Sequence, residues 1–127
     1  MPLDPRLKVL AGSSHPDLAH EIAAQLDVPL PSAFVGRFPD VEIDIKIHDD
    51  MRGADVFLIQ STSPTVNEHL VEMLLMVDTL RRASASRITA VMPYFGYARK
   101  DRKDEGRVPI SAKVVANMMV SAGCDRV

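Results

Sequence analysis

The chain of 127 residues contains a single cysteine and few aromatic side chains, and both shortages restrict what it can be. Cys124 has no partner for an intrachain disulfide, which favours a reducing compartment, and its small apolar neighbours predict a packed core thiol. Aromatic residues make up 5% of the chain and the net charge is −2. A basic surface with stacked rings for nucleic acid is therefore not expected.

Long apolar runs and a secretory leader are also missing. No apolar run reaches the ~18 residues that a membrane-spanning helix needs, and the N-terminus lacks a signal-peptide pattern. We therefore expect a cytoplasmic protein without a membrane partner.

The short motifs of several common sites are absent as well. The four histidines have no spacing typical of metal ligands, and each is expected to be a surface or packing residue. No Walker A sequence, GxGxxG fingerprint or nucleophile elbow occurs. The site must therefore be located from loops and charges.

Apolar runs alternate with segments of helical periodicity along the whole chain. We expect strands over residues 7–12, 31–38, 42–48, 56–61 and 87–93, and helices over 13–27, 65–82 and 109–123. The connection FPDVE between the second and third strands is too short for a crossover helix, so these strands should pair as a hairpin or flap. The order predicts an α/β domain of three layers, with a mostly parallel sheet flanked by helices.

Some finer features follow from the same patterns. Ser14 or His15 should cap the first helix, and Thr65 with Glu68 should form a capping box on the second. Residues 125–127 read as the lead into a further strand, so the chain is expected to be an N-terminal fragment.

Residues 91–113 are the most informative segment. Five cations occur within nine residues after a strand, while the rest of the chain is acidic. Ligands of open α/β sheets bind beyond the carboxyl ends of strands, so this loop is a candidate receptor for phosphate oxygens. Gly96 and Gly106 should act as hinges; the alternative is a solvated surface loop. The cations are Arg99, Lys100, Arg102, Lys103 and Arg107.

Acidic side chains and one aromatic ring add two weaker signals. Asp101 and Asp104 could orient the cations or help to hold Mg²⁺, and charge balancing is the simpler interpretation. In FPDVE, Phe38 could stack on a purine while Asp40 or Glu42 accepts a hydrogen bond from an exocyclic amine. A phenylalanine beside a strand is more often a core residue.

These segments together resemble the N-terminal domain of ribose-phosphate pyrophosphokinases, the phosphoribosyl pyrophosphate synthetases. The resemblance runs through FPDVEIDI, RGADVFLIQSTSPTVNEHLVEMLLMVDTLRRASASRITAVMPYFGYARKDRK and RVPISAKVVANMMVSAG. It implies a phosphoribosyltransferase-like fold. Residues 1–127 would then be the N-terminal domain of a two-domain synthetase whose C-terminal domain is absent.

Family membership implies a Mg²⁺-dependent transfer of the β,γ-diphosphoryl group of ATP to the 1-hydroxyl of ribose 5-phosphate. It also implies a homo-oligomer, a hexamer in the family. The family's metal-binding histidine motif lies beyond Val127, so neither catalytic nor metal-binding residues are expected here, and this chain alone should not turn over. The alternative is a non-catalytic regulatory or associated subunit of the same family.

The resemblance also implies which residues bind ATP. The cationic loop would contribute Arg99, Lys100, Asp101, Arg102 and Lys103, with Lys100 at a position where many members have glutamine. Phe38, Asp40 and Glu42 match a flap that holds adenine and that the neighbouring subunit contributes. The usual flap pattern is FSDGE, so Pro39 and Val41 here replace a serine and a glycine.

Overall fold

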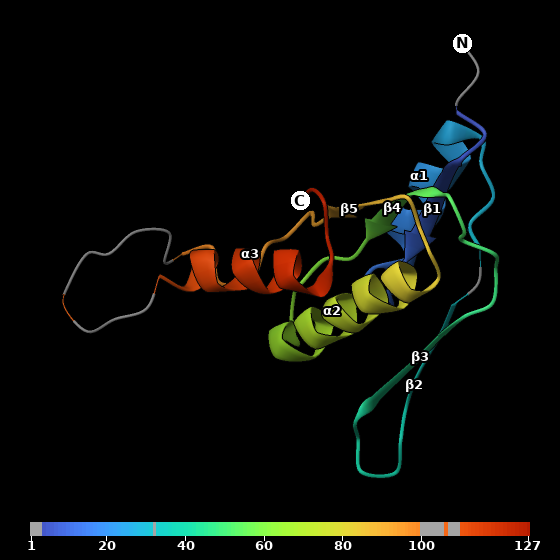
Figure 1. Cartoon of the computed structure of the whole chain (residues 1–127). Coiled ribbons are helices and arrows are strands. Elements are labelled where there is room, and N and C mark those ends of the chain that lie inside the picture. The colour runs from blue at the N-terminus through green and yellow to red at the C-terminus, as the bar shows by residue number, and fades with distance from the viewer. Residues whose placement is uncertain (1–3, 32, 100–105, 107–109) are drawn as a thin grey trace.

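The computed structural model describes residues 4–31, 33–99, 106 and 110–127, Phe34 by its backbone only. Eight helices and strands follow one another in the predicted order within these residues (Figure 1). They are β1 (Leu7–Ala11), α1 (Pro16–Leu26), β2 (Ala33–Arg37), β3 (Ile43–Ile47), β4 (Asp55–Ile59), α2 (Val66–Arg82), β5 (Arg87–Val91) and α3 (Ser111–Ala122).

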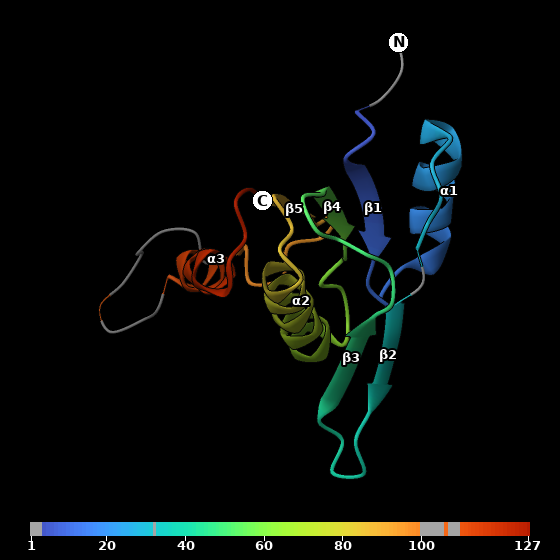
Figure 2. The same ribbon diagram turned by 45° about the vertical axis from the view of Figure 1, so that its right-hand side comes forward.

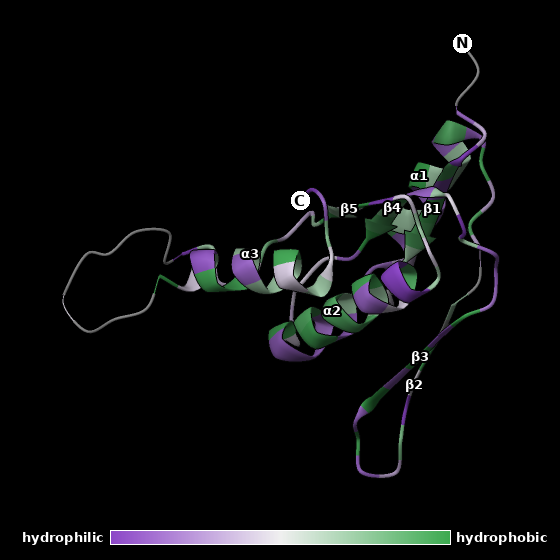
Figure 3. Ribbon diagram, viewed as in Figure 1, coloured by the Kyte–Doolittle hydropathy of each residue, from purple (hydrophilic) through white to green (hydrophobic). Residues whose placement is uncertain are grey.

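The main sheet consists of three parallel strands in the order β1-β4-β5. Phe57 in β4 pairs with Val9 on one side and with Thr89 on the other. The central position explains the continuous apolar sequence of β4, because a strand covered on both faces has no polar side. Figure 3 shows this strand in the green of apolar residues.

Helices cover both faces of this sheet, which makes three layers (Figure 2). Alternate residues of each strand point to opposite faces, so Val9 and Ile59 pack with Ala19 of α1. Leu10, Leu58 and Ala90 belong to the larger core with α2 and α3. The expected α/β class and layer arrangement are confirmed.

Methionine fills much of the larger core. An unbranched side chain with a polarisable sulfur adapts to irregular gaps between a sheet and two helices. Cys124 lies in the same core, at 5% exposure, as its apolar neighbours predicted. Burial raises the pKa of its thiol, which therefore stays protonated at neutral pH. The core methionines are Met51, Met73, Met76 and Met119.

The strands β2 and β3 form the predicted hairpin. They pair antiparallel, with Val35 opposite Ile45. Ile45 and Ile47 pack against the larger core and so anchor the base of the hairpin. Its turn projects from the body of the domain in both views (Figures 1 and 2).

One of the finer expectations is confirmed and one is wrong. The His15 ring accepts the N–H of Leu18 at 3.2 Å and caps α1, and residue 126 forms a parallel bridge with Thr89 of β5. Thr65, however, makes no side-chain bond to the backbone of α2. Its hydroxyl donates to the Glu68 carboxylate at 2.9 Å, so the two side chains satisfy each other. None of the helices within the described segments is both long and apolar enough to cross a membrane.

Candidate functional site

The carboxyl ends of the three parallel strands form one connected edge. Beyond β1, the N–H of Gly12 donates to the carbonyl of Ile59 at 3.0 Å. Beyond β4, the N–H of Gln60 donates to the carbonyl of Val91 at 3.0 Å. The three loops that follow therefore start side by side, at the edge where open α/β sheets bind ligands.

A buried carboxylate ties the first two of these loops together. Glu72 of α2 is 4% exposed. It accepts bonds from the Ser13 N–H at 2.7 Å, the Ser13 hydroxyl at 2.5 Å and the Gln60 amide at 2.7 Å. The Gln60 oxygen in turn accepts from the Ser14 hydroxyl at 2.7 Å. These bonds compensate for the desolvation of a buried charge.

Gly12 is required by this network. A Cβ atom at position 12 would lie 2.2 Å from Oε1 of Gln60 and 2.6 Å from Oε2 of Glu72. Any other residue would therefore displace two buried polar side chains.

The third loop follows β5 and leads to Arg99. A cavity of about 740 Å³ opens beside it, and the exposed Arg99 is one of its walls. Tyr94 and Tyr97, 46% and 42% exposed, present aromatic surface to the same space. A guanidinium beside aromatic rings suits a ligand with both phosphate and a planar ring. The lining residues are Pro64, Val66, Tyr94, Phe95, Gly96, Tyr97, Ala98, Arg99 and Ser111.

Arg99 is the one member of the predicted ATP loop that the structure describes. The other members lie outside the described residues, as do Asp104 and Arg107. They are Lys100, Asp101, Arg102 and Lys103.

Gly96 has a packing role that the sequence did not predict. A Cβ atom at this position would lie 2.6 Å from Cγ1 of Val66 and 3.1 Å from the carbonyl oxygen of Thr62. The glycine allows the loop to press against the start of α2. The sequence did not indicate this role, because the crowding residues come from a distant part of the chain.

The predicted flap residues meet on the turn of the hairpin. Phe38 is 47% exposed, and Asp40 and Glu42 are also exposed. The Phe38 N–H donates to the Glu42 carbonyl at 2.9 Å, which closes the turn. Val41 between them has a φ of 66°, a left-handed conformation that is unusual for a β-branched residue. The structure brings the three flap residues together, but Figures 1 and 2 show the turn projecting away from the segment that follows β5.

An ion pair ties this hairpin to α2. The Arg37 guanidinium lies 2.9 Å from the Glu68 carboxylate and also donates to the Val41 carbonyl at 3.0 Å. The Thr65 hydroxyl, followed by the charge of Arg37, lowers the pKa of Glu68 below its usual value. The orientation of the turn is thus linked to the first turn of α2.

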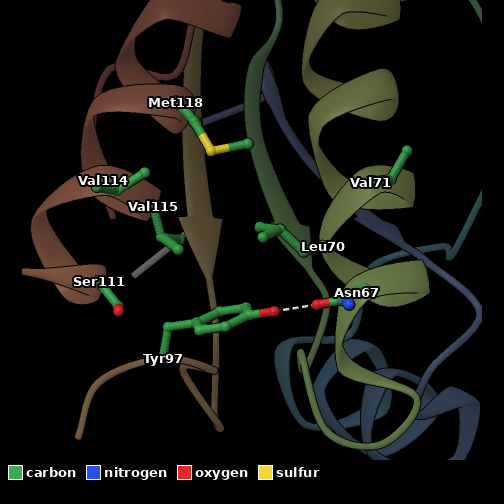
Figure 4. Close-up of a pocket in the computed structure, with 8 residues that line it drawn as sticks. All are labelled: Asn67, Leu70, Val71, Tyr97, Ser111, Val114, Val115 and Met118. Carbon is green, nitrogen blue, oxygen red and sulfur yellow. Dashed lines mark hydrogen bonds between the residues drawn. The ribbon is translucent and has the colours of Figure 1, made fainter. Parts of the chain in front are cut away.

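An apolar groove of about 330 Å³ runs between α2 and α3 (Figure 4). Tyr97 and Ser111 line both this groove and the cavity beside Arg99. Met118 lines the groove at 40% exposure. The lining residues are Asn67, Leu70, Val71, Tyr97, Ser111, Val114, Val115 and Met118.

Sequence reasoning missed the two tyrosines and Thr62, which is 1% exposed below the loop. The density of aromatic residues around Gly96 was a usable signal for Tyr94 and Tyr97. Thr62 had no comparable signal, because its partners lie beyond another strand and helix.

Metal ligands do not gather in the part of the chain that the structure describes. Within it, no group of three or more His, Cys, Asp or Glu side chains is arranged to hold an ion.

Comparison with known proteins assigns the family. Residues 7–123 match the family model for the N-terminal domain of ribose phosphate pyrophosphokinase. The ribose-phosphate pyrophosphokinases of Maricaulis maris and Bradyrhizobium diazoefficiens are 55% and 57% identical over 121 residues, which is 95% of this chain.

A solved structure agrees with this match. The crystal structure of phosphoribosylpyrophosphate synthetase from Mycobacterium smegmatis superposes with a TM-score of 0.91 at 43% identity, covering 94% of this chain and 40% of that one. The chain spans 39% and 38% of the length of the two relatives named above. The chain belongs to the ribose-phosphate pyrophosphokinase family.

Proposed function

We propose that this chain is the ATP-binding N-terminal part of a ribose-phosphate diphosphokinase. The whole enzyme would transfer the β,γ-diphosphoryl group of ATP to the 1-hydroxyl of ribose 5-phosphate, giving phosphoribosyl pyrophosphate and AMP. The observation that carries the proposal is the position of Arg99, on a cavity with two exposed tyrosines beyond the carboxyl end of β5. The cytoplasm is the proposed location.

Arg99 supplies what such a transfer needs from this side of the site. Charge accumulates on phosphoryl oxygens during the displacement, and a fixed guanidinium stabilises it. We assign the same task to Lys100, Arg102 and Lys103, with Asp101 orienting them.

The adenine ring would be held by Phe38, Asp40 and Glu42 of a second copy of the chain. In support, these three residues share an exposed turn that points away from the chain's own Arg99 segment (Figure 1). The aromatic ring would stack on the purine and a carboxylate would accept a bond from its amine.

Mg²⁺ is proposed to arrive with the nucleotide phosphates, since the described residues offer no cluster of ligands for it. The ribose 5-phosphate contacts are proposed to belong to a second domain. The 127-residue chain alone would then bind nucleotide and leave it intact.

Titration of the purified chain with MgATP in a calorimeter tests the nucleotide site. We expect Arg99→Ala to weaken binding about tenfold or more, because a charge-assisted hydrogen bond is lost. Arg82→Ala removes the same charge from the far end of α2, where the side chain is 80% exposed, and should leave affinity within about twofold. Equal affinities of the two variants would contradict the assignment of Arg99.

The lack of turnover is tested separately. The chain is incubated with MgATP and ribose 5-phosphate, and AMP is measured. Sustained AMP formation would show that the chain carries a complete site, against this proposal. Failure of the parent chain to bind MgATP would instead favour an assembly or regulatory subunit.

A further inference from the structure

We infer that Thr62 is a positioning residue for the nucleotide loop, an inference that rests on the proposed function of Arg99. Thr62 follows β4 and is 1% exposed, so its side chain cannot reach a ligand in the cavity. Its hydroxyl nevertheless has two specific partners in the loop that leads to Arg99.

Three hydrogen bonds join Thr62 to this loop. The hydroxyl accepts the N–H of Gly96 at 2.7 Å and donates to the carbonyl of Tyr94 at 2.9 Å. The backbone N–H of Thr62 donates to the same carbonyl at 3.0 Å. One buried side chain thus uses both its donor and an acceptor position to fix the turn before Arg99.

The loop is held in a conformation that it would not adopt unaided. Tyr97 has a φ of 72°, a left-handed conformation that is strained for a residue with a Cβ atom. The residue before Tyr97 is Gly96, whose N–H donates to the Thr62 hydroxyl. The Tyr97 hydroxyl itself donates to the Asn67 side chain of α2 (Figure 4). Strain of this kind persists because both anchors are in place.

Arg99 is only three residues beyond Gly96, so these hydrogen bonds fix the position of the backbone from which its side chain extends. Without the Thr62 hydroxyl, the Gly96 N–H would lose its partner and the turn would relax from its strained conformation. Nucleotide binding would then have to order the loop again, which lowers affinity. Thr62 acts through Arg99 and touches no reacting atom.

The test compares two substitutions at position 62. Thr62→Val keeps the shape and loses the hydroxyl, whereas Thr62→Ser keeps the hydroxyl and loses the methyl group. Thr79→Val, the same change at a hydroxyl that bonds within α2, is the matched control. Each chain is assayed for MgATP affinity, for hydrogen exchange of the Gly96 amide and for thermal midpoint.

We expect Thr62→Val to accelerate Gly96 exchange about tenfold and to weaken MgATP binding about fivefold, as loss of one buried hydrogen bond implies. Thr62→Ser should restore both to within about twofold even if its thermal midpoint falls, because the hydroxyl is present. A merely structural role predicts instead that affinity is unchanged in both variants.

Two results overturn different claims. If the parent chain binds no MgATP, the proposed function is wrong, and this inference, which depends on it, is wrong as well. If the parent binds and Thr62→Val binds equally well, only the positioning role fails. Should Thr62→Val not fold, Thr62→Ala removes the same hydroxyl from the loop; it must lower affinity relative to Thr62→Ser, and equal affinities of these two variants refute the inference.

Discussion

At the scale of single residues, two positions carry conformations or charges that an average protein avoids. Glu72 is a carboxylate buried between two loops, with no cation among the hydrogen-bond partners described above. Val41 holds a left-handed backbone on an exposed turn. For each position, a single substitution should change the stability of the chain in a direction that follows from hydrogen bonding or backbone geometry.

Glu72→Gln should destabilise the chain by about 2–3 kcal/mol. The amide group would face the Ser13 donors with a donor of its own, and buried groups would lose their partners. Urea unfolding followed by circular dichroism measures the effect. Glu21→Gln, the same change on the exposed side of α1, should stay within about 0.5 kcal/mol. Similar values for the two would mean that the buried network adds little to stability.

Val41→Gly should stabilise the chain by about 0.5–1 kcal/mol. Glycine adopts a positive φ without the clash that a β-branched residue suffers, and this gain exceeds the added freedom of the unfolded chain. Val120→Gly, at an exposed position within α3, must have the opposite sign because glycine weakens a helix. Thermal unfolding of both variants gives the comparison. A loss of stability at position 41 would show that the side chain, 72% exposed here, makes a contact worth more than the strain.

At the scale of elements, the hairpin is the least embedded part of the described fold. Only its base packs into the core, and the Arg37–Glu68 pair steadies the rest. An exposed ion pair contributes little to global stability, so its effect should appear in the orientation of the hairpin.

Acid should therefore loosen the hairpin before it unfolds the domain. The pKa of Glu68 is lowered in the folded state, so the tether is complete above the usual value of 4.5 and is lost as pH falls through the lower folded value. Backbone amide shifts of β2 and β3, followed by NMR between about pH 6 and pH 3, should show this step. The Glu68→Gln variant should show no such change in the amide shifts of β2 and β3 over that pH range. Identical titrations of the two chains would rule the tether out.

Helices and strands could be predicted from the sequence where neighbouring residues determine them. The alternation of Ile43, Ile45 and Ile47 with polar residues specified β3, and the short FPDVE connection required a hairpin. The capping box was wrong although its spacing was right, because Thr65 and Glu68 bond to each other. The preference of two side chains for each other over the helix backbone cannot be read from their spacing.

Contacts between distant segments could not be predicted in this way. Glu72 and Ser13 are 59 residues apart, and Thr62 and Gly96 are 34 apart. Their bonds exist because parallel strands bring their carboxyl ends to one edge, and strand order follows from packing. The cationic loop was found as a candidate from its charge and its place after a strand, and the residues that hold it were not.

At the scale of the whole molecule, the proposed nucleotide site needs two chains. The flap residues and Arg99 lie on segments that point apart, while the groove between α2 and α3 leaves apolar surface next to the cavity. A second chain that lends its hairpin would complete the site. Association of two chains would then be required for a complete nucleotide site.

Mixing two defective chains tests this arrangement. Phe38→Ala and Arg99→Ala should each impair MgATP binding when pure. In an equal mixture that exchanges partners as a two-fold dimer, about a quarter of the sites regain both residues. Calorimetric titration should therefore recover about that fraction of tight sites. If the mixture binds no better than its components, the two residues do not act across a shared site; light scattering must also show an assembly larger than one chain.

The tight fit around Gly12 has a consequence for how related sequences can vary. Because the space for a side chain at position 12 is already occupied by Gln60 and Glu72, the three positions cannot drift independently. A relative with alanine or serine in place of Gly12 should carry a shorter residue at position 60 or 72, or have lost both polar side chains together. Glycine at position 12 thus indicates that the hydrogen-bond network joining the ends of β1 and β4 to α2 is present.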